Sequence, residues 1–508
     1  MESTKASKAT NSPVFIHWFR TDCLRLDDNP SFNKCLEKLN HTGGELMCVF
    51  ILDPSFLSPI SDGPSVNVWR FLLESLCDLD EQLQNHHKRP LRVFCGDPSL
   101  ILGEVFRSKP VKGISFQASQ NSYESHLFDV YIKKMCTAAN VKVYSEYSHT
   151  LFTPDIITRA SNNKPPESYC SFRQLLPSLG RPLAPVFLVD VKKDKLFAVE
   201  DASLLPYEIK MPTLQDFGFD GTESLSTGSF VGGELVGLQK LAEFSKSRSG
   251  MSKNLKGWLT MKDSLSPYIR FGCVSVRQIF HQINKVAPSD HQLLSTMAKN
   301  LLLREFAYCV AFHSPKFDQM VGNKLCIQLP WDQKPEVETR ILEASTGFPW
   351  IDAIITQCRT EGWAHYIARK SLAIFLTRGY LWVSWVFGRE FFQDVMLDYE
   401  MPVSAVCWMQ DSCSGFFSDT IESLDPIEIG RKMDPQGEYI KRYLPKLKDY
   451  PPEYIHAPWL APTDVQEKAG CVIGQDYPKP IVELCTQGKL CCARIEAIMN
   501  ALEDAYND

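Results

Sequence analysis

The first 150 residues alternate between short apolar runs and longer stretches with helical periodicity. The short runs are rich in β-branched and aromatic residues and span residues 14–19, 46–52, 91–95, 113–117 and 141–145. Helical patterns, including residues 66–83 and 123–138, lie between them. This alternation predicts strands joined by helices, the arrangement of a parallel doubly wound sheet. The sequence has no GxGxxG, so it does not predict a dinucleotide-binding fingerprint.

The pattern changes after residue 150. From about 150 to 230, Pro, Ser and Asp are frequent, which predicts a surface connector with some local helix. From Gly232 onward the apolar spacing is helical almost throughout, which predicts a large all-helical second domain. The expected helices span residues 234–245, 276–286, 293–312, 335–344, 350–361, 364–377, 383–396 and 491–506.

The predicted fold class is therefore α/β plus all-α, with an N-terminal sheet domain joined by a long connector to a helical domain. The expected segments are a disordered arm (1–13), the α/β domain (14–148), the connector (149–230), the helical domain (231–490) and a C-terminal helix (491–508).

Composition and charge narrow the class of protein. A chain of 508 residues is too long for one simple core, and 44% apolar with 22% charged residues is typical of globular proteins. No run of 18 apolar residues exists and the polar N-terminus is not a secretory signal, so we expect no membrane span. Seventeen irregularly spaced cysteines predict free thiols in a reducing compartment and no metal site. A net charge of −6 gives no global support for nucleic-acid binding.

The most informative stretch of the sequence runs from residue 367 to residue 411. It places Arg369 and the acidic pair Asp398 and Glu400 in apolar, helix-forming sequence that is rich in Trp. A buried charge needs a partner, and the Trp N–H also needs one. The combination predicts a pocket for a large, flat ligand with polar edges.

Motifs in this stretch and elsewhere resemble those of the cryptochrome/photolyase family, in particular its animal cryptochrome branch. The motifs occur in the family's order over residues 14–490: WFRTDCLRLDDNP, SLSPYIRFGCVS, LLREFAY, FDQMVGN, TGFPWIDA, EGWAHYIAR, TRGYLWVSW, LDYE, VCWMQ and DPQGEYIKRYLPKL. The resemblance implies FAD as cofactor in the helical domain. No ligands for an antenna chromophore are recognisable, so we expect none.

The resemblance also implies which residues hold the flavin. The loop Ser264, Leu265 and Ser266 is expected at the pyrophosphate, with Arg304 as the charged partner of Ser266; helix capping and a surface arginine are the structural alternatives. Tyr366 is expected in the cofactor site.

Arg369 and Asp398 are expected to pair over the reactive edge of the flavin. Glu400 stands where the family has Asp, which puts its hydrogen bond to the flavin in doubt. Ser404 is expected to face flavin N5, where relatives have Asn, Cys or Asp. Val406, Cys407 and Gln410 depart further from the family pattern, so redox behaviour does not transfer directly.

Four tryptophans match the family's electron-transfer positions, in the order Trp408, Trp385, Trp331 and Trp382 from flavin to surface. Trp382 and Trp385 are three residues apart, so we expect both on one helix face. The alternative is plain core packing, which we favour for Trp350, Trp363 and Trp459.

The residues that repair enzymes use are replaced. Leu303 replaces a Trp that packs on the lesion, and Tyr366 and Lys370 replace the two His of the (6-4) photolyases. His suits proton donation near neutral pH, whereas Tyr does not without a large pKa shift. His365 remains beside that pair. We expect no repair activity and weak or absent DNA binding.

The favoured hypothesis is a blue-light photoreceptor that is reduced through the Trp chain and signals to protein partners, clock components among the candidates. The alternatives are a photolyase with an atypical pocket and a light-independent, clock-type transcriptional repressor. We expect a location in the cytoplasm, the nucleus or both; the oligomeric state is left open.

Overall fold

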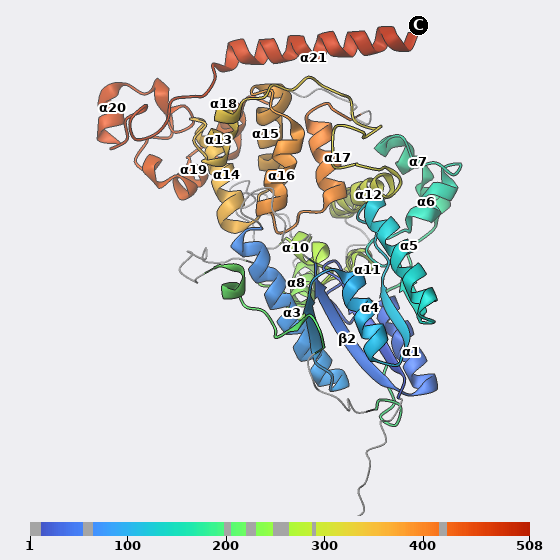
Figure 1. The fold of residues 1–508 in the computed structure, drawn as a ribbon. Coiled ribbons are helices and arrows are strands. Elements are labelled where there is room, and N and C mark those ends of the chain that lie inside the picture. Colours follow the sequence, from blue (N-terminus) through green and yellow to red (C-terminus); the bar gives the residue numbers. More distant parts are fainter. Residues whose placement is uncertain are drawn as a thin grey trace, which may run out of the picture.

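In the computed structural model the chain forms two lobes, one built on a sheet and one helical (Figure 1). The structure describes residues 12–53, 64–197, 205–219, 230–246, 264–286, 291–415 and 424–507. The expected N-terminal arm lies outside these residues except for its last two positions.

The N-terminal lobe contains a six-stranded sheet in the order β5-β4-β1-β2-β3-β6. The strands are β1 (Val14–Phe19), β2 (Glu45–Leu52), β3 (Leu91–Cys95), β4 (Val111–Gln117), β5 (Lys142–Glu146) and β6 (Glu208–Ile209). The first five pair in parallel, and β6 pairs antiparallel with β3. Every residue of β1 and β2 is buried, as expected for central parallel strands covered on both faces. The doubly wound sheet predicted from the sequence is confirmed.

Helices cover this sheet and continue into the connector. They are α1 (Pro30–Thr42), α3 (Val66–His87), α4 (Pro98–Ser108), α5 (Tyr123–Ala138), α6 (Pro154–Ala160) and α7 (Tyr169–Leu179), with a short helix η1 (Leu214–Phe217). The connector also supplies strand β6, which periodicity did not predict because it has only two residues. Arg92 on β3 binds Glu208 on β6, with Nε 2.7 Å from Oε1. The connector is therefore fastened to the edge of the sheet.

The helical lobe begins at Glu234, and several of its helices pack side by side (Figure 1). Its elements are α8 (Glu234–Lys246), α10 (Ser266–Arg270), α11 (Val276–Val286), α12 (His291–His313), α13 (Pro335–Leu342), α14 (Pro349–Glu361), α15 (Tyr366–Ile374), η2 (Phe375–Gly379), α16 (Trp385–Val395), α17 (Met401–Asp411), α18 (Pro426–Met433), α19 (Glu438–Tyr443), η3 (Pro445–Leu447), η4 (Pro458–Leu460), α20 (Thr463–Lys468) and α21 (Leu484–Asn507). The last of these crosses the end of the lobe remote from the sheet (Figure 1).

The predicted helix over residues 383–396 begins later than expected, and this corrects one prediction. Helix α16 starts at Trp385, with the Ser384 side chain capping the Val386 N–H. Trp382 lies before the cap in a left-handed backbone conformation, with φ of 55°. Trp382 and Trp385 therefore do not share a helix face, because Trp382 lies outside the helix.

Buried carboxylates join the two lobes. Glu234, at the start of α8, accepts hydrogen bonds from the backbone N–H groups of Leu26 and Asp27 at 2.7 and 2.9 Å. Burial raises the pKa of Glu234 to about 8. Arg277 on α11 binds Asp28 through Nη2 at 2.6 Å. These contacts hold the helical lobe against loops that leave the carboxyl ends of the strands.

Candidate functional site

A cavity of about 410 Å³ opens between helices α12, α15, α16 and α17 of the helical lobe. It gathers most of the side chains predicted for the cofactor site. The predicted residues on its wall are Leu303, Tyr366, Arg369, Lys370, Asp398, Glu400, Ser404, Cys407, Trp408 and Gln410. Ala373, Phe392, Met396 and Val403 supply an apolar surface beside them. An apolar wall with a few convergent polar groups is the usual composition of a cofactor site.

An ion pair between Arg369 and Asp398 forms the polar edge of the cavity. Arg369 Nη2 donates to Asp398 Oδ2 at 2.8 Å, and its Nε donates to the backbone oxygen of Ala364 at 2.7 Å. Ser266 Oγ donates to the same Asp398 oxygen at 2.6 Å, and Ser264 Oγ lies 2.7 Å from Ser266 Oγ. The two serines and the ion pair predicted from sequence thus meet at one place.

Two polar atoms of the cavity wall have no partner among the described residues. Asp398 Oδ1 and Ser404 Oγ are both buried and accept or donate no hydrogen bond there. Unsatisfied buried polar groups are uncommon, and those on the wall of a cavity are available to a ligand. A flat aromatic ring system with polar edges fits these two atoms and the apolar wall. The residues present therefore fit the isoalloxazine ring of a flavin.

Glu400 and Arg304 form a second ion pair, which departs from the expectation that Arg304 is the charged partner of Ser266. Arg304 Nη2 lies 2.6 Å from Glu400 Oε1, and Arg304 Nη1 donates to the backbone oxygen of His149 at 2.7 Å. Tyr308 Oη donates to Glu400 Oε1 at 2.7 Å, and His149 Nε2 lies 3.1 Å from the same atom. Arg304 is thus paired with Glu400 and not with Ser266. Glu400 thus lines the cavity while its carboxylate is bound to this arginine.

The environment of this pair fixes its charge state. Burial raises the pKa of Glu400, but the adjacent Arg304 and the hydrogen bonds outweigh it and hold the pKa well below its usual range. Burial, assisted by Arg304, lowers the pKa of His149. At neutral pH the group therefore holds one carboxylate, one guanidinium and a neutral imidazole.

Sequence reasoning missed His149 and Tyr308. Tyr308 follows Arg304 by four residues on α12, so the two share a helix face, and the Arg304 guanidinium lies 4.4 Å from the Tyr308 ring centroid. An arginine inside an apolar helix signals a buried partner. That signal could have identified a cluster, but nothing in the local sequence indicates that His149 of the connector joins it.

The loop predicted to bind the pyrophosphate leads into a very short helix. Helix α10 has five residues, and Leu265 at its start is buried in the core. The hydroxyl groups of Ser264 and Ser266 bond to each other and to Asp398. Their contact with a pyrophosphate therefore stays a prediction.

The four predicted tryptophans lie in two neighbouring apolar clusters, and Trp408 borders the cavity. Trp408 lines the cavity and packs against Phe392, with ring centroids 5.1 Å apart. The Trp408 indole covers Gly388 of α16, where an added Cβ would lie 2.1 Å from Trp408 Cη2. Trp385 is fully buried in the same apolar core.

Trp331 connects this core to a smaller apolar cluster that contains Trp382. The ring centroids of Trp331 and Trp382 are 5.1 Å apart, with an angle of 52° between the planes. Trp382 is fully buried, whereas Trp331 is half-buried. The predicted order ends at Trp382 on the surface, but Trp331 is the more exposed indole of the two, because α21 packs in the same cluster as Trp382.

The mouth of the cavity carries the residues that replace the repair groups. Tyr366 is 66% exposed, and Leu303 and Lys370 also line the cavity. His365 caps α15 by accepting a hydrogen bond from the Ile367 N–H. Burial, assisted by Arg369, lowers the pKa of His365 to about 4. His365 is therefore neutral at physiological pH and does not offer an imidazolium proton.

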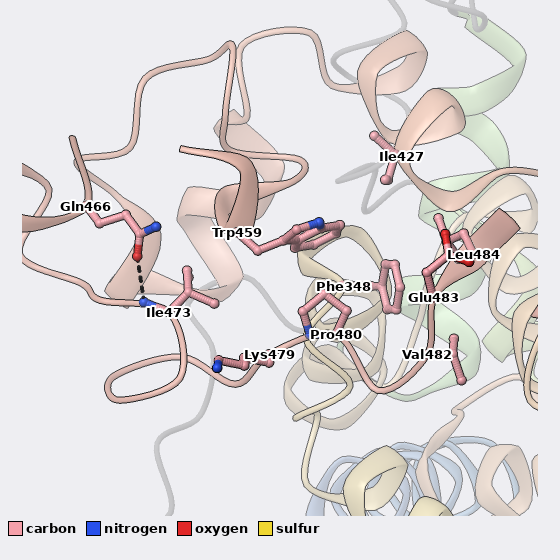
Figure 2. Close-up of a pocket in the computed structure, with 10 residues that line it drawn as sticks. All are labelled: Phe348, Ile427, Trp459, Gln466, Ile473, Lys479, Pro480, Val482, Glu483 and Leu484. Atoms are coloured by element: carbon pink, nitrogen blue, oxygen red, sulfur yellow. Dashed lines mark hydrogen bonds between the residues drawn. The ribbon is translucent and has the colours of Figure 1, made fainter. Parts of the chain in front are cut away.

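A second cavity, of about 570 Å³, lies where the C-terminal segments meet the start of α14. Figure 2 shows Phe348 and Trp459 at its centre, and their ring centroids are 5.3 Å apart. Its charged lining groups are Lys479 and Glu483. It lacks the buried ion pair and unpaired acceptors of the first cavity, so we place the cofactor in the first.

Comparison with protein families gives two matches that divide the chain as the structure does. Residues 15–194 match the DNA photolyase family model, and residues 297–497 match the FAD binding domain of DNA photolyase. The sheet lobe and the helical lobe with its cavity are thus those of a photolyase-type flavoprotein.

Curated relatives and solved structures agree. The chain is 39% identical to cryptochrome-2 of Gallus gallus over 501 residues, covering 96% of this chain and 84% of the relative. It is 38% identical to cryptochrome-1 of Mus musculus over 504 residues, covering 96% and 80%. A class III photolyase structure from Agrobacterium tumefaciens aligns with a TM-score of 0.80 at 25% identity, covering 98% of this chain and 100% of that one. A Synechocystis cryptochrome aligns with a TM-score of 0.81 at 22% identity, covering 95% and 99%, and shows the fold alone.

The chain belongs to the cryptochrome/photolyase family. Its helical lobe is an FAD-binding domain of that family, and the two curated relatives named above are animal cryptochromes. Within the described ranges, none of the helices combines the length and apolar character that crossing a bilayer requires.

Proposed function

We propose that this protein is an FAD-dependent blue-light photoreceptor that is reduced through a tryptophan chain and signals to protein partners in the cytoplasm or nucleus. When bound, FAD excited by blue light supplies a strong one-electron oxidant. The single observation that carries the proposal is the placement of the four indoles: Trp408 lies on the cavity wall, Trp385 lies in the same core, and the half-buried Trp331 borders both this core and the cluster of Trp382. Trp408 gives up the electron, Trp385 refills Trp408, and the Trp331–Trp382 pair refills Trp385.

The remaining residues bind and orient the cofactor. The Arg369–Asp398 pair and Ser404 would hold the polar edge of the isoalloxazine, and Ser264 and Ser266 would hold the phosphate side. The apolar wall from Phe392 and Met396 excludes water from the ring. We propose no antenna chromophore.

The first test is an absorption spectrum of the purified protein in the dark and then under blue light with an external reductant. We expect oxidised flavin bands that bleach on illumination. Trp408→Phe should slow bleaching at least tenfold. Trp350→Phe, which alters an equally buried indole packed on Tyr439, is the matched control and should leave the rate unchanged. Equal bleaching in wild type and Trp408→Phe would rule out the proposed chain.

We also propose that the protein does not repair DNA. The supporting observations are the neutral His365 and the replacement of the lesion-facing groups by Leu303, Tyr366 and Lys370. Incubation with each of the two ultraviolet lesions under blue light should give no turnover. Clear repair of either lesion would make the chain a photolyase with an atypical pocket.

A light-independent transcriptional repressor is the second candidate. Its supporting observation is Glu400, which is bound to Arg304 and so contributes one acceptor fewer to the cavity. A colourless purified protein that takes up no added FAD would favour this candidate over the photoreceptor.

A further inference from the structure

The two edges of the sheet differ in how they are covered. At one edge, β6 of the connector pairs antiparallel with β3. At the other edge, β5 pairs with β4, and the described part of the chain supplies no strand beyond it. An uncovered edge presents N–H and C=O groups that can bind another strand. The fold therefore closes one edge of the sheet and leaves the other open.

Val143 and Ser145 carry the backbone groups of β5 that face the open side. The assignment follows from Glu146, whose backbone oxygen accepts the N–H of Ala118, just beyond β4, at 2.9 Å. In a parallel pair, residues whose backbone groups bond to the neighbouring strand alternate with residues whose groups face away from it. Glu146 and Tyr144 therefore face β4 with their backbone groups, and the two residues next to Tyr144 face outward.

A hollow of about 580 Å³ lies along this edge, lined by side chains of α1 and α5 and by the whole of β5. Lys142, Tyr144 and Glu146 share one face of β5, because side chains alternate along a strand. This is the face toward α1, where Lys34 binds Glu146. Val143 lies on the opposite face and packs against the core of the sheet. The α1 face of the open edge thus carries one cation and one anion of its own.

The order of the charges along β5 is self-complementary. Lys142 and Glu146 lie two residues before and two residues after Tyr144. When two copies of the strand pair antiparallel about a two-fold axis at Tyr144, Lys142 of each copy lies opposite Glu146 of the other. Because the backbone groups of Tyr144 face β4, these opposite residues form non-hydrogen-bonded pairs, in which the side chains approach most closely.

We propose that β5 pairs with β5 of a second copy of this chain, so that two six-stranded sheets join into one continuous sheet. The outward-facing backbone groups of Val143 and Ser145 supply the hydrogen bonds, and the Lys142–Glu146 pairs fix the register. A contact of this kind uses the same surface on both copies, so it closes at a dimer. An acidic strand from another protein would match Lys142 but would place a like charge opposite Glu146, whereas the strand's own sequence matches both. This inference goes beyond the proposed function and does not depend on the flavin.

The test measures the mass of the purified full-length protein, kept in the dark, by analytical ultracentrifugation over a concentration series at low ionic strength. Wild type should form a dimer. Lys142→Glu and Glu146→Lys each place like charges opposite each other at both symmetry-related positions, and each should raise the dimer dissociation constant at least about tenfold. Lys448→Glu changes an exposed lysine of the helical lobe, and this control should dimerise as wild type does. Circular dichroism spectra check that each variant is folded.

Mixing the two variants tests the register itself. An equal mixture of the Lys142→Glu and Glu146→Lys chains restores opposite charges at both positions, so it should form heterodimers although neither chain dimerises alone. A single chain that carries both changes should dimerise with itself.

Four results would overturn the proposal. A wild type that stays monomeric at every concentration would show that the lysines protect the edge from pairing. Dimers that persist in both single variants would place the contact elsewhere. A mixture that remains monomeric would exclude the antiparallel register. A monomeric wild type that binds a glutamate-rich peptide, with binding lost in Lys142→Glu, would assign the edge to a different protein.

Discussion

Two arginine–carboxylate pairs lie just before α17. They have the same chemistry, but they differ in how many of their hydrogen-bonding atoms have partners. Arg304 and Glu400 use their atoms on each other, on Tyr308 and on His149. Their side chains are 5% and 9% exposed. Asp398, two residues earlier, accepts from Arg369 and Ser266 through one oxygen and leaves the other buried without a described partner.

This difference separates a pair that stabilises the fold from a pair that is available to a ligand. The first pair is closed, and it joins the connector, α12 and α17, which belong to different parts of the chain. Removing one member leaves an uncompensated buried charge. The second pair is open toward the cavity and retains an acceptor for a ligand. We infer that a buried ion pair marks a binding site when its hydrogen-bonding capacity is unfilled, and that its presence alone does not.

The largest expected effect comes from breaking the closed pair. Arg304→Met removes the partner of Glu400 and should lower the free energy of unfolding by about 3–5 kcal/mol, measured by urea denaturation. Arg369→Met, the matched change in the open pair, should cost less, because that arginine is 25% exposed and Ser266 still donates to Asp398. Equal losses in the two variants would contradict the distinction.

Asp398→Asn tests the open pair with a nearly isosteric change. A charge-assisted hydrogen bond contributes about 1.5–3 kcal/mol, so the dissociation constant for FAD should rise at least about tenfold. Fluorescence titration of the apoprotein measures it. The exposed Asp464→Asn is the control and should bind FAD as wild type does. Unchanged affinity in Asp398→Asn would mean that the orphan oxygen does not face the ligand.

Acid should weaken the closed pair in a predictable direction. Because the pKa of Glu400 is depressed in the folded state, its stabilising contribution is present above the ordinary pKa of 4.5 and is lost as the pH falls below that value. The free energy of unfolding should therefore fall below pH 4.5 by up to about 1.4 kcal/mol per pH unit from this group. Denaturation at several pH values should show a shallower slope in Glu400→Gln.

The smallest effect is expected at Ser404. Its hydroxyl has no described partner, so Ser404→Ala should change the free energy of unfolding by less than about 0.5 kcal/mol. The flavin absorption bands should nevertheless shift, because the hydroxyl faces the cavity. A loss above about 1.5 kcal/mol in thermal unfolding would show that the hydroxyl has a structural partner.

The difference between local patterns and long-range contacts explains how much of the structure the sequence could predict. Strands β1 and β3 and helices α5 and α11 follow from apolar periodicity alone, because burial of one face or both dictates the spacing. The Arg369–Asp398 pair was expected from the family resemblance. The sequence does not predict the partners of Glu400, because Arg304 and His149 are distant from it along the chain and approach it only in the folded protein.

The backbone conformation at Trp382 also limited what the sequence could predict. The left-handed backbone at Trp382 is unfavourable for a bulky residue, and local propensity predicted that α16 would start two residues too early. Tertiary contacts fix it instead: Trp382 bonds to Thr377 and Pro330 and lies under α21. The two-residue strand β6 likewise depends on its partner β3.

Gly388 has a consequence for reading other sequences of this kind. A glycine inside a helix costs about 1 kcal/mol relative to alanine, and a single methyl group here would overlap the six-membered ring of Trp408. Natural variation at this position is therefore constrained by a neighbouring ring and not by the helix that contains it. A relative that carries alanine there must have moved or replaced this indole, so one codon reports on the geometry of the cavity wall.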